Sequence, residues 1–534
     1  MNFQIAINRF AVIFCAFCFL LGCPEVGETD GGGNGDGDGD AGSPIVDGGD
    51  NGDGDGDGDG DGDGDGDGDA GAPVMDSGTP MMDAGAPTMD AGTPMMDAGT
   101  PIDVSFCMVQ YDFGEHKSLF AAAGDLDGDD QQELVFANVT DGPNRVWRYD
   151  DADGGWVVHQ ELDLTDMGYV NNNNTHVTLL GDLDNDTDLD LFVANNHHSD
   201  RVYLWENGNF VLQNEELRSH PTQTFENTTV VNPSGGISHN GPYAWGGAIA
   251  DMDGDGFNDL VVGMGTSTQG HQNVVYLNRP VDAGPGSGRS FGDNPVFFSA
   301  GTAETKVIAV ADLDNDGRVD IVMGTAKNPP PPQTVSQDYV FWSEDPIDAG
   351  CGEPLCFTAQ PLSDTADATS TYGLAIADFD QDGLLDVVAG KQPTPATATP
   401  QSVLYINNGD RSFGKYDSQI VGTAHVKSLA AADINNDGFP DLVVGSYWQG
   451  SPAPEADAVY LGTGNPDGPF NLLQPLPNST HETTGLVISD VNHDGIMDVV
   501  AAAFSPEGEG MIAAPNRLYL GNTEGNTGDC LGNN

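Results

Sequence analysis

An acidic motif occurs seven times in this chain and constrains the fold more than any other feature of the sequence. It reads D-x-[DN]-x-D-G-x-x-[DE], with a short apolar run on either side. The copies begin 55 to 69 residues apart, at 125–133, 182–190, 251–259, 312–320, 378–386, 433–441 and 490–498. Such a near-constant interval indicates a repeat architecture with one structural unit per copy.

The spacing within the motif brings oxygen ligands around one point. Oxygens at positions 1, 3 and 5 of a tight loop converge, and a glycine at position 6 allows the sharp turn. The backbone carbonyl at position 7 and the carboxylate at position 9 complete a shell that suits calcium better than magnesium. We therefore expect up to seven calcium ions, held by the following residues: Asp125, Asp127, Asp129, Gln131, Glu133, Asp182, Asp184, Asp186, Asp188, Asp190, Asp251, Asp253, Asp255, Phe257, Asp259, Asp312, Asp314, Asp316, Arg318, Asp320, Asp378, Asp380, Asp382, Leu384, Asp386, Asp433, Asn435, Asp437, Phe439, Asp441, Asp490, Asn492, Asp494, Ile496 and Asp498.

The motif has two other possible interpretations. An EF-hand loop places its last ligand at position 12 and leads into a helix, whereas here position 9 opens into β-branched runs such as "IVMG" at 321–324. Acidic hairpin turns without a metal are the second alternative, and seven copies argue against it.

Some copies depart from the motif. Asp130 and Thr187 replace the glycine at position 6, so these loops must strain or use another turn. Asn435 and Asn492 keep an oxygen at position 3 but lose its charge. We expect weaker binding in the first loop than in the third to fifth.

These motifs resemble the FG-GAP and VCBS-type repeats, as found in the propeller of integrin alpha chains. The resemblance covers essentially all of 104–534 and implies an all-β, seven-bladed β-propeller of four-stranded antiparallel blades. It also implies calcium in the loop between the first two strands of each blade. A strand within 104–114 belongs to no blade of its own and is expected to complete the seventh, which would remove the open edges.

Four cysteines follow the N-terminal region, an even number for an exported chain. A bridge from Cys107 to Cys530 would lock the ring closure, and one from Cys351 to Cys356 would staple a hairpin. Other pairings remain open.

Residues 1–22 are typical of a lipoprotein signal peptide, because Arg9 precedes an apolar run too short to span a bilayer comfortably. The sequence Leu20-Leu21-Gly22-Cys23 resembles a lipobox, which would make Cys23 the lipidated N-terminus of a bacterial envelope protein at the outer membrane or cell surface. An ordinary signal peptide is the alternative. Residues 23–103 are a low-complexity Asp/Gly/Ala/Pro-rich segment without a basic residue, which is typical of a disordered tether before the propeller at 104–534.

The charge of the chain limits its partners. A formal net charge of −68 excludes nucleic-acid binding and leaves the lipid anchor as the only expected membrane contact. We expect a monomer.

The segments that enter the first strand of each blade lie on the face opposite the metal loops. Most of the histidines and several of the few lysines fall there, and the candidate ligand face comprises His116, His176, His239, Trp245, Lys306, Tyr372, His425, Lys427 and His481. Ordinary solvated turns are the alternative. No GxSxG, HExxH or phosphate-loop motif is present, so no catalytic residue is assigned. We expect adhesion to or recognition of a glycan or surface protein; a carbohydrate-active lyase or hydrolase using the same face, or a purely structural envelope component, is the alternative.

Overall fold

The structure is a computed structural model, and the part of the chain that it describes is discontinuous. The described residues are 102–109, 111, 113, 118–138, 143–150, 154–162, 175–195, 200–213, 230–231, 237–238, 244–265, 273–280, 289–291, 295–298, 304–326, 337–349, 351, 354–362, 369–393, 402–416, 425–446, 456–465, 468–479, 482–504 and 516–523. Among these residues, no helix is long and apolar enough to cross a membrane.

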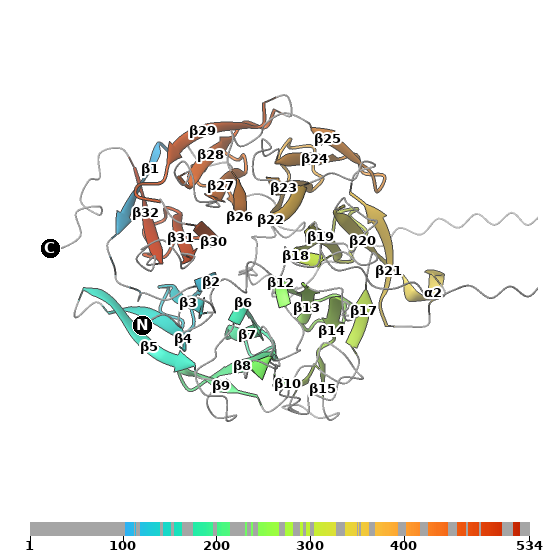
Figure 1. Cartoon of the computed structure of the whole chain (residues 1–534), viewed down its shortest axis with the longest axis horizontal. Coiled ribbons are helices and arrows are strands. Elements are labelled where there is room, and N and C mark those ends of the chain that lie inside the picture. Colours follow the sequence, from blue (N-terminus) through green and yellow to red (C-terminus); the bar gives the residue numbers. More distant parts are fainter. Residues whose placement is uncertain are drawn as a thin grey trace, which may run out of the picture. The chain divides into compact units, whose positions relative to one another are not determined.

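Seven four-stranded antiparallel sheets form a ring of blades, which confirms the expected propeller (Figure 1). The strands of blades 1 to 3, from the inside outwards, are β2 (Ser118–Gly124), β3 (Glu133–Asn138), β4 (Asn144–Asp150) and β5 (Gly155–Leu162); β6 (Thr175–Gly181), β7 (Asp190–Asn195), β8 (Arg201–Glu206) and β9 (Asn209–Leu212); and β12 (Ala244–Ala250), β13 (Asp259–Met264), β14 (Asn273–Tyr276) and β17 (Pro295–Phe298). Those of blades 4 to 6 are β18 (Glu304–Ala311), β19 (Asp320–Ala326), β20 (Tyr339–Glu344) and β21 (Cys356–Pro361); β22 (Thr369–Ala377), β23 (Asp386–Pro393), β24 (Val403–Asn407) and β25 (Phe413–Tyr416); and β26 (Val426–Ala432), β27 (Asp441–Ser446), β28 (Ala458–Gly462) and β29 (Phe470–Pro475).

Blade 7 takes its outermost strand from the start of the propeller. Its strands are β30 (Glu482–Ser489), β31 (Asp498–Phe504), β32 (Arg517–Thr523) and β1 (Val104–Val109), in that order. The register of β1 on β32 runs from Val104 opposite Thr523 to Val109 opposite Leu518. The ring is thus closed by a strand more than 400 positions away in the sequence, as the unassigned strand at 104–114 predicted.

The remaining elements are short and lie outside the blades. They are the paired strands β10 (Val230–Val231) and β11 (Ile237–Ser238), the paired strands β15 (Arg279–Pro280) and β16 (Arg289–Ser290), and the one-turn helix α2 (Pro346–Ala349).

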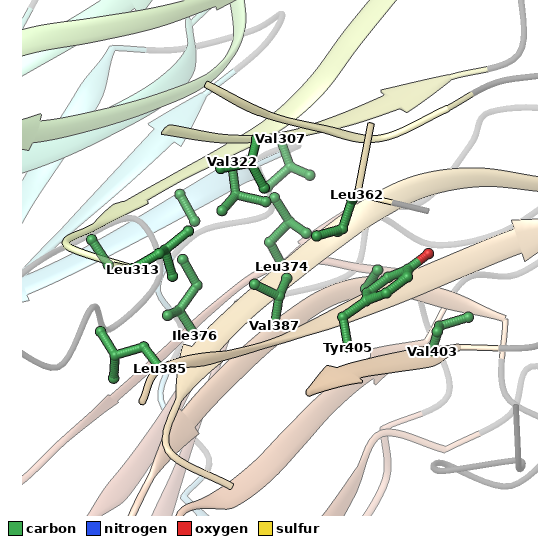
Figure 2. Close-up of a cluster of buried hydrophobic side chains, with 14 of the residues drawn as sticks. Val307, Leu313, Val322, Leu362, Leu374, Ile376, Leu385, Val387, Val403 and Tyr405 are labelled. Carbon is green, nitrogen blue, oxygen red and sulfur yellow. The ribbon is translucent and has the colours of Figure 1, made fainter. Parts of the chain in front are cut away.

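Each interface between neighbouring blades is filled by its own cluster of buried apolar side chains. Figure 2 shows the cluster between blades 4 and 5, where Val322 on β19 meets Leu374 on β22 and Val387 on β23. All three are at most 1% exposed. Truncation of a buried leucine such as Leu374 to alanine costs about 2–5 kcal/mol, so blade packing is a main source of stability.

The innermost strand of every blade carries a β-bulge at its start. In blade 3 the pairing of β12 with β13 skips Trp245, because Ala244 pairs with Met264 and Gly246 with Gly263. The same shift leaves one extra residue in each of the other blades, namely Leu119, His176, Lys306, Tyr372, Lys427 and Thr484. A bulge re-aims the side chain of its extra residue, and these seven residues form what we call the bulge ring.

Neighbouring inner strands touch just beyond the bulges. A Cβ added to Gly246 would lie 2.8 Å from the backbone nitrogen of Ile308 in blade 4, and one added to Gly373 would lie 2.9 Å from that of Leu429 in blade 6. Glycine is required at both places because no side chain fits between the strands.

Candidate functional site

All seven acidic loops connect an innermost strand to the second strand of its blade, as expected. The loop of blade 5 shows the shared arrangement. Asp378 accepts the Gly383 N–H at 2.9 Å through Oδ2, and Asp386 accepts the Phe379 N–H at 3.0 Å and the Asn407 N–H at 2.8 Å. These bonds fix the first and last carboxylates of the motif before any ion enters.

Five loops bring three carboxylates close enough to hold one metal ion, with ligand oxygens within 4.8 Å of one another. The clusters are Asp125, Asp127 and Glu133; Asp182, Asp184 and Asp190; Asp251, Asp253 and Asp255; Asp312, Asp314 and Asp316; and Asp378, Asp380 and Asp386. The donor set is made of hard oxygen ligands and fits a hard cation. In the loops of blades 6 and 7 an asparagine stands at position 3, and the amides of Asn435 and Asn492 donate to Asp437 at 3.0 Å and to Asp494 at 3.1 Å.

The turn of every loop uses left-handed backbone at positions 4 and 6. Position 6 has φ between 70° and 89° in all seven copies, including Asp130 at 70° and Thr187 at 81°. The two loops without glycine at position 6 therefore keep the common turn and accept its strain, which is greatest for the β-branched Thr187.

The last carboxylate of each loop is buried. Burial raises the pKa of Asp190, Asp386 and Asp498 to about 8, against the backbone N–H groups that lower it. Neighbouring loop acids raise it further. A bound cation would remove this cost by supplying the missing positive charge.

At the opposite end of the inner strands, the bulge ring surrounds a central hollow of about 60 Å³, which we call the mouth. It is lined by five of the predicted ligand-face residues: His176, Trp245, Lys306, Tyr372 and Lys427. Leu119 and Thr484 complete the ring, and sequence reasoning missed them. Every bulge residue stands six positions before the first aspartate of its loop, so counting back from the motif would have found both.

Side chains of the bulge ring contact each other across blade boundaries. The rings of His176 and Trp245 are 4.5 Å apart, and the His176 Nδ1 is 2.9 Å from the Ala244 carbonyl oxygen. The Lys427 ammonium lies 4.4 Å from the centre of the Tyr372 ring and 3.4 Å from Glu482. The mouth is therefore a preformed surface rather than seven separate loops.

The other predicted face residues are placed differently. His425 lies just before β26 and is not part of the mouth lining. Its buried Nδ1 has no hydrogen-bond partner within the described ranges. His116, His239 and His481 lie outside the described residues.

The sequence predicts two disulfide bridges, Cys107–Cys530 and Cys351–Cys356. Cys351 and Cys356, the first residue of β21, are disulfide-bonded, with Cα atoms 6.4 Å apart. Cys107 on β1 is also disulfide-bonded. Cys530 and the lipidation candidate Cys23 lie outside the described residues, so the Cys107–Cys530 bridge and the lipid anchor stay predictions.

Comparison with known families and proteins agrees with the repeat architecture. The FG-GAP-like repeat model matches residues 182–262, 251–323 and 378–444. Human integrin alpha-7 is 33% identical over 114 residues, which cover 18% of this chain and 10% of that protein. Integrin alpha-3 of Cricetulus griseus is 32% identical over 121 residues, 20% of this chain and 12% of that protein.

Two further similarities cover more of the chain at lower identity. The phosphatidylinositol-glycan-specific phospholipase D of Bos taurus is 23% identical over 289 residues, 45% of this chain and 34% of that protein. The solved structure of an Agrocybe aegerita lectin, which recognises non-reducing terminal N-acetylglucosamine, covers 76% of this chain and 85% of the lectin chain at 14% identity and a TM-score of 0.41. That score is too low to support an inference about a ligand. The chain spans about a tenth of the integrin alpha chains and a third of the phospholipase.

Proposed function

Because this chain is a seven-bladed β-propeller that carries FG-GAP-like repeats, we propose that it is a recognition protein whose mouth binds a macromolecular ligand. The observation that carries the proposal is the bulge ring. Seven bulges at equivalent positions direct seven side chains toward one hollow. Five of these side chains can bind a polar or charged group: two lysines, one histidine, one tryptophan and one tyrosine.

The geometry favours a ligand that reaches the mouth with a small polar group. A hollow of about 60 Å³ has room for a few water molecules only. Lys306 lies over Trp245 and Lys427 lies over Tyr372. Both ring faces are thus partly covered, so recognition would rely on hydrogen bonds and charge rather than on stacking against the rings. A glycan or a surface protein that projects a carboxylate or hydroxyl group meets this requirement.

We also propose that calcium binds the acidic loops and stabilises the propeller that carries the mouth. The five acidic clusters would each bind calcium, with the remaining loop carboxylates and the position 7 carbonyl as further ligands, and the ions would reduce the repulsion between the loop acids. Melting curves of the full chain in calcium and in chelator test this point. We expect melting many degrees lower in chelator, because binding to the folded state alone stabilises it by RT ln(1 + [L]/Kd) per site. Equal melting temperatures would contradict calcium binding.

Display at the cell surface completes the proposal. Acylation of Cys23 and the tether at 23–103 would hold the propeller away from a membrane, because 81 residues would span roughly 50 Å as a flexible coil. Intact-mass measurement of the envelope-associated protein would detect the acyl chains. A Cys23→Ser variant should be released as a soluble protein.

The test of recognition is retention on immobilised polysaccharides and cell-surface extracts, with product formation recorded in the same samples. Retention without products supports a binding protein. New reducing or unsaturated ends would instead identify a carbohydrate-active enzyme that uses the same mouth.

A further inference from the structure

The seven acidic loops differ in one respect that the motif does not show. In blades 3 and 4, arginine side chains reach into the loop and pair with the acids that a metal ion would need. Arg279, which begins β15, pairs with Asp253 and lies 2.5 Å from Asp255. In the described parts of the loops of blades 1, 2, 5, 6 and 7, no arginine or lysine forms an ion pair with a loop acid. Burial raises the pKa of Asp127 in blade 1 and the charge of Arg148 on β4 lowers it, but without such a contact.

Arg411 makes the most extensive of these contacts, and it comes from another blade. It lies in the hairpin between β24 and β25 of blade 5, and its Nε donates to Asp314 of blade 4 at 2.6 Å. Its Nη2 lies 3.4 Å from Asp316, which Arg318 of the same loop also contacts. Asp314 and Asp316 are two of the three carboxylates that form the cluster of that loop.

The position of Arg411 is held by several independent contacts. Its Nη1 donates to Glu344 at 2.6 Å, and its guanidinium lies 5.4 Å from the centre of the Trp342 ring. Gln360 of blade 4 donates to its backbone carbonyl at 2.8 Å, which fixes the hairpin itself. Its side chain is 30% exposed, so water screens its charge only in part.

We propose that Arg279 and Arg411 are built-in counter-cations, which neutralise the loops of blades 3 and 4 without a metal and make these two loops the last to bind calcium. A guanidinium that holds the same carboxylates repels an incoming divalent ion or has to be displaced by it. A unit charge about 5 Å from a divalent ion weakens its binding by roughly tenfold in water, before salt screening. The inference rests on the calcium sites of the proposed function. For the third and fourth loops it also reverses the order expected from the motif alone, in which the third to fifth loops bind calcium more tightly than the first.

Calcium titration of the full chain by calorimetry tests the proposal, with calcium alone as the probe. Arg411→Gln and Arg279→Gln should each tighten one weak site by roughly tenfold. In chelator the same variants should melt below wild type, because the loop acids lose their counter-charge, and saturating calcium should abolish the difference. Arg145→Gln is the matched control, since Arg145 pairs with Glu161 at 3.0 Å on the outer strands of blade 1, away from the acidic loops.

The outcomes distinguish a failure of the calcium sites from a failure of the counter-cation role alone. If calcium leaves the melting temperature of wild type unchanged, the calcium sites and this inference both fail. If wild type responds to calcium but the calcium isotherms of both variants match wild type or weaken, the counter-cation role alone is overturned, and Arg411 becomes a positioning residue for Asp314. The two arginines contact different acidic loops, Arg279 that of blade 3 and Arg411 that of blade 4. If one variant fails to fold, the other therefore still tests the proposal.

Discussion

The ammonium of Lys306 lies 3.8 Å from the centre of the Trp245 ring, although the two residues belong to neighbouring blades. Both are bulge residues at the mouth, and Glu304 holds the same ammonium at 2.8 Å. The contact therefore joins blades 3 and 4 at the proposed ligand site and couples its shape to blade packing.

Replacement of Lys306 by methionine separates the charge at this position from its packing. We expect loss of ligand retention together with a stability cost of about 1–2 kcal/mol, because a partly desolvated cation–π contact is lost. The control is Lys415→Met on the exposed strand β25. Thermal unfolding and the retention assay measure the two effects. Full retention by Lys306→Met would show that the ammonium does not contact the ligand.

Thr187 offers a test of strain in an acidic loop. Its φ of 81° is unfavourable for a β-branched residue, so Thr187→Gly should raise the free energy of unfolding by about 1 kcal/mol or more. Thr187→Ala, which keeps a Cβ, should gain less. In the converse experiment Gly317→Ala in blade 4 should destabilise, although nothing lies within 4 Å of the added Cβ. Chemical denaturation checks all three, and a neutral result for Thr187→Gly would contradict the strain.

Much of this fold follows from the repeated motif, and the reasons are local. The acidic spacing and the apolar run after position 9 are present in all seven copies, and glycine stands at position 6 in five of them; together they indicate each loop and the strand that follows it. The number of blades then follows from the number of copies, and the closing strand from the strand left over before Asp125.

The sequence predicts five of the seven bulge residues that line the mouth and misses two. Its histidine and two lysines stood out against an acidic chain, but Leu119 and Thr484 carry no chemical signal of their own. Their role comes from the bulge, a backbone feature that residue type does not reveal. The ion pair from Arg411 to Asp314 joins residues 97 positions apart, and only the packing of blade 5 against blade 4 brings them together.

If Cys107 and Cys530 close the ring, their bridge should stabilise the protein more than the bridge between Cys351 and Cys356. Peptide mapping under non-reducing conditions should find Cys107 joined to Cys530. Cys107→Ser should lower stability by about 2–4 kcal/mol and Cys351→Ser by less, because a bridge that closes a long loop restricts the unfolded chain more. A different partner for Cys107, or a larger loss with Cys351→Ser, would refute this assignment.

Two buried acids outside the metal loops predict a pH dependence. Burial raises the pKa of Asp200 and of Asp457 to about 7, against the N–H groups of Asn195 and Ser446, which lower it. In the unfolded chain an aspartate titrates near about 3.9. The folded state therefore binds the proton more tightly, and the stability this contributes is present below about pH 4 and lost as the pH rises to about 7.

The variant Asp457→Asn isolates this contribution in calcium-saturated protein. The free energy of unfolding of wild type should fall relative to that of the variant between about pH 4 and pH 7. Urea titrations at several pH values give both curves. Parallel curves would mean that Asp457 does not titrate in this range.

The central claim is that the mouth binds a ligand, and retention of the calcium-loaded chain on a panel of polysaccharides and cell-surface extracts tests it most directly. Substitution of His176, Trp245 and Lys427 by alanine should abolish retention, whereas His159→Ala and Lys415→Ala on outer strands should leave it unchanged. Melting curves in calcium verify that the variants are folded. Retention that survives the mouth substitutions, or no retention of wild type on any member of the panel, would contradict the account.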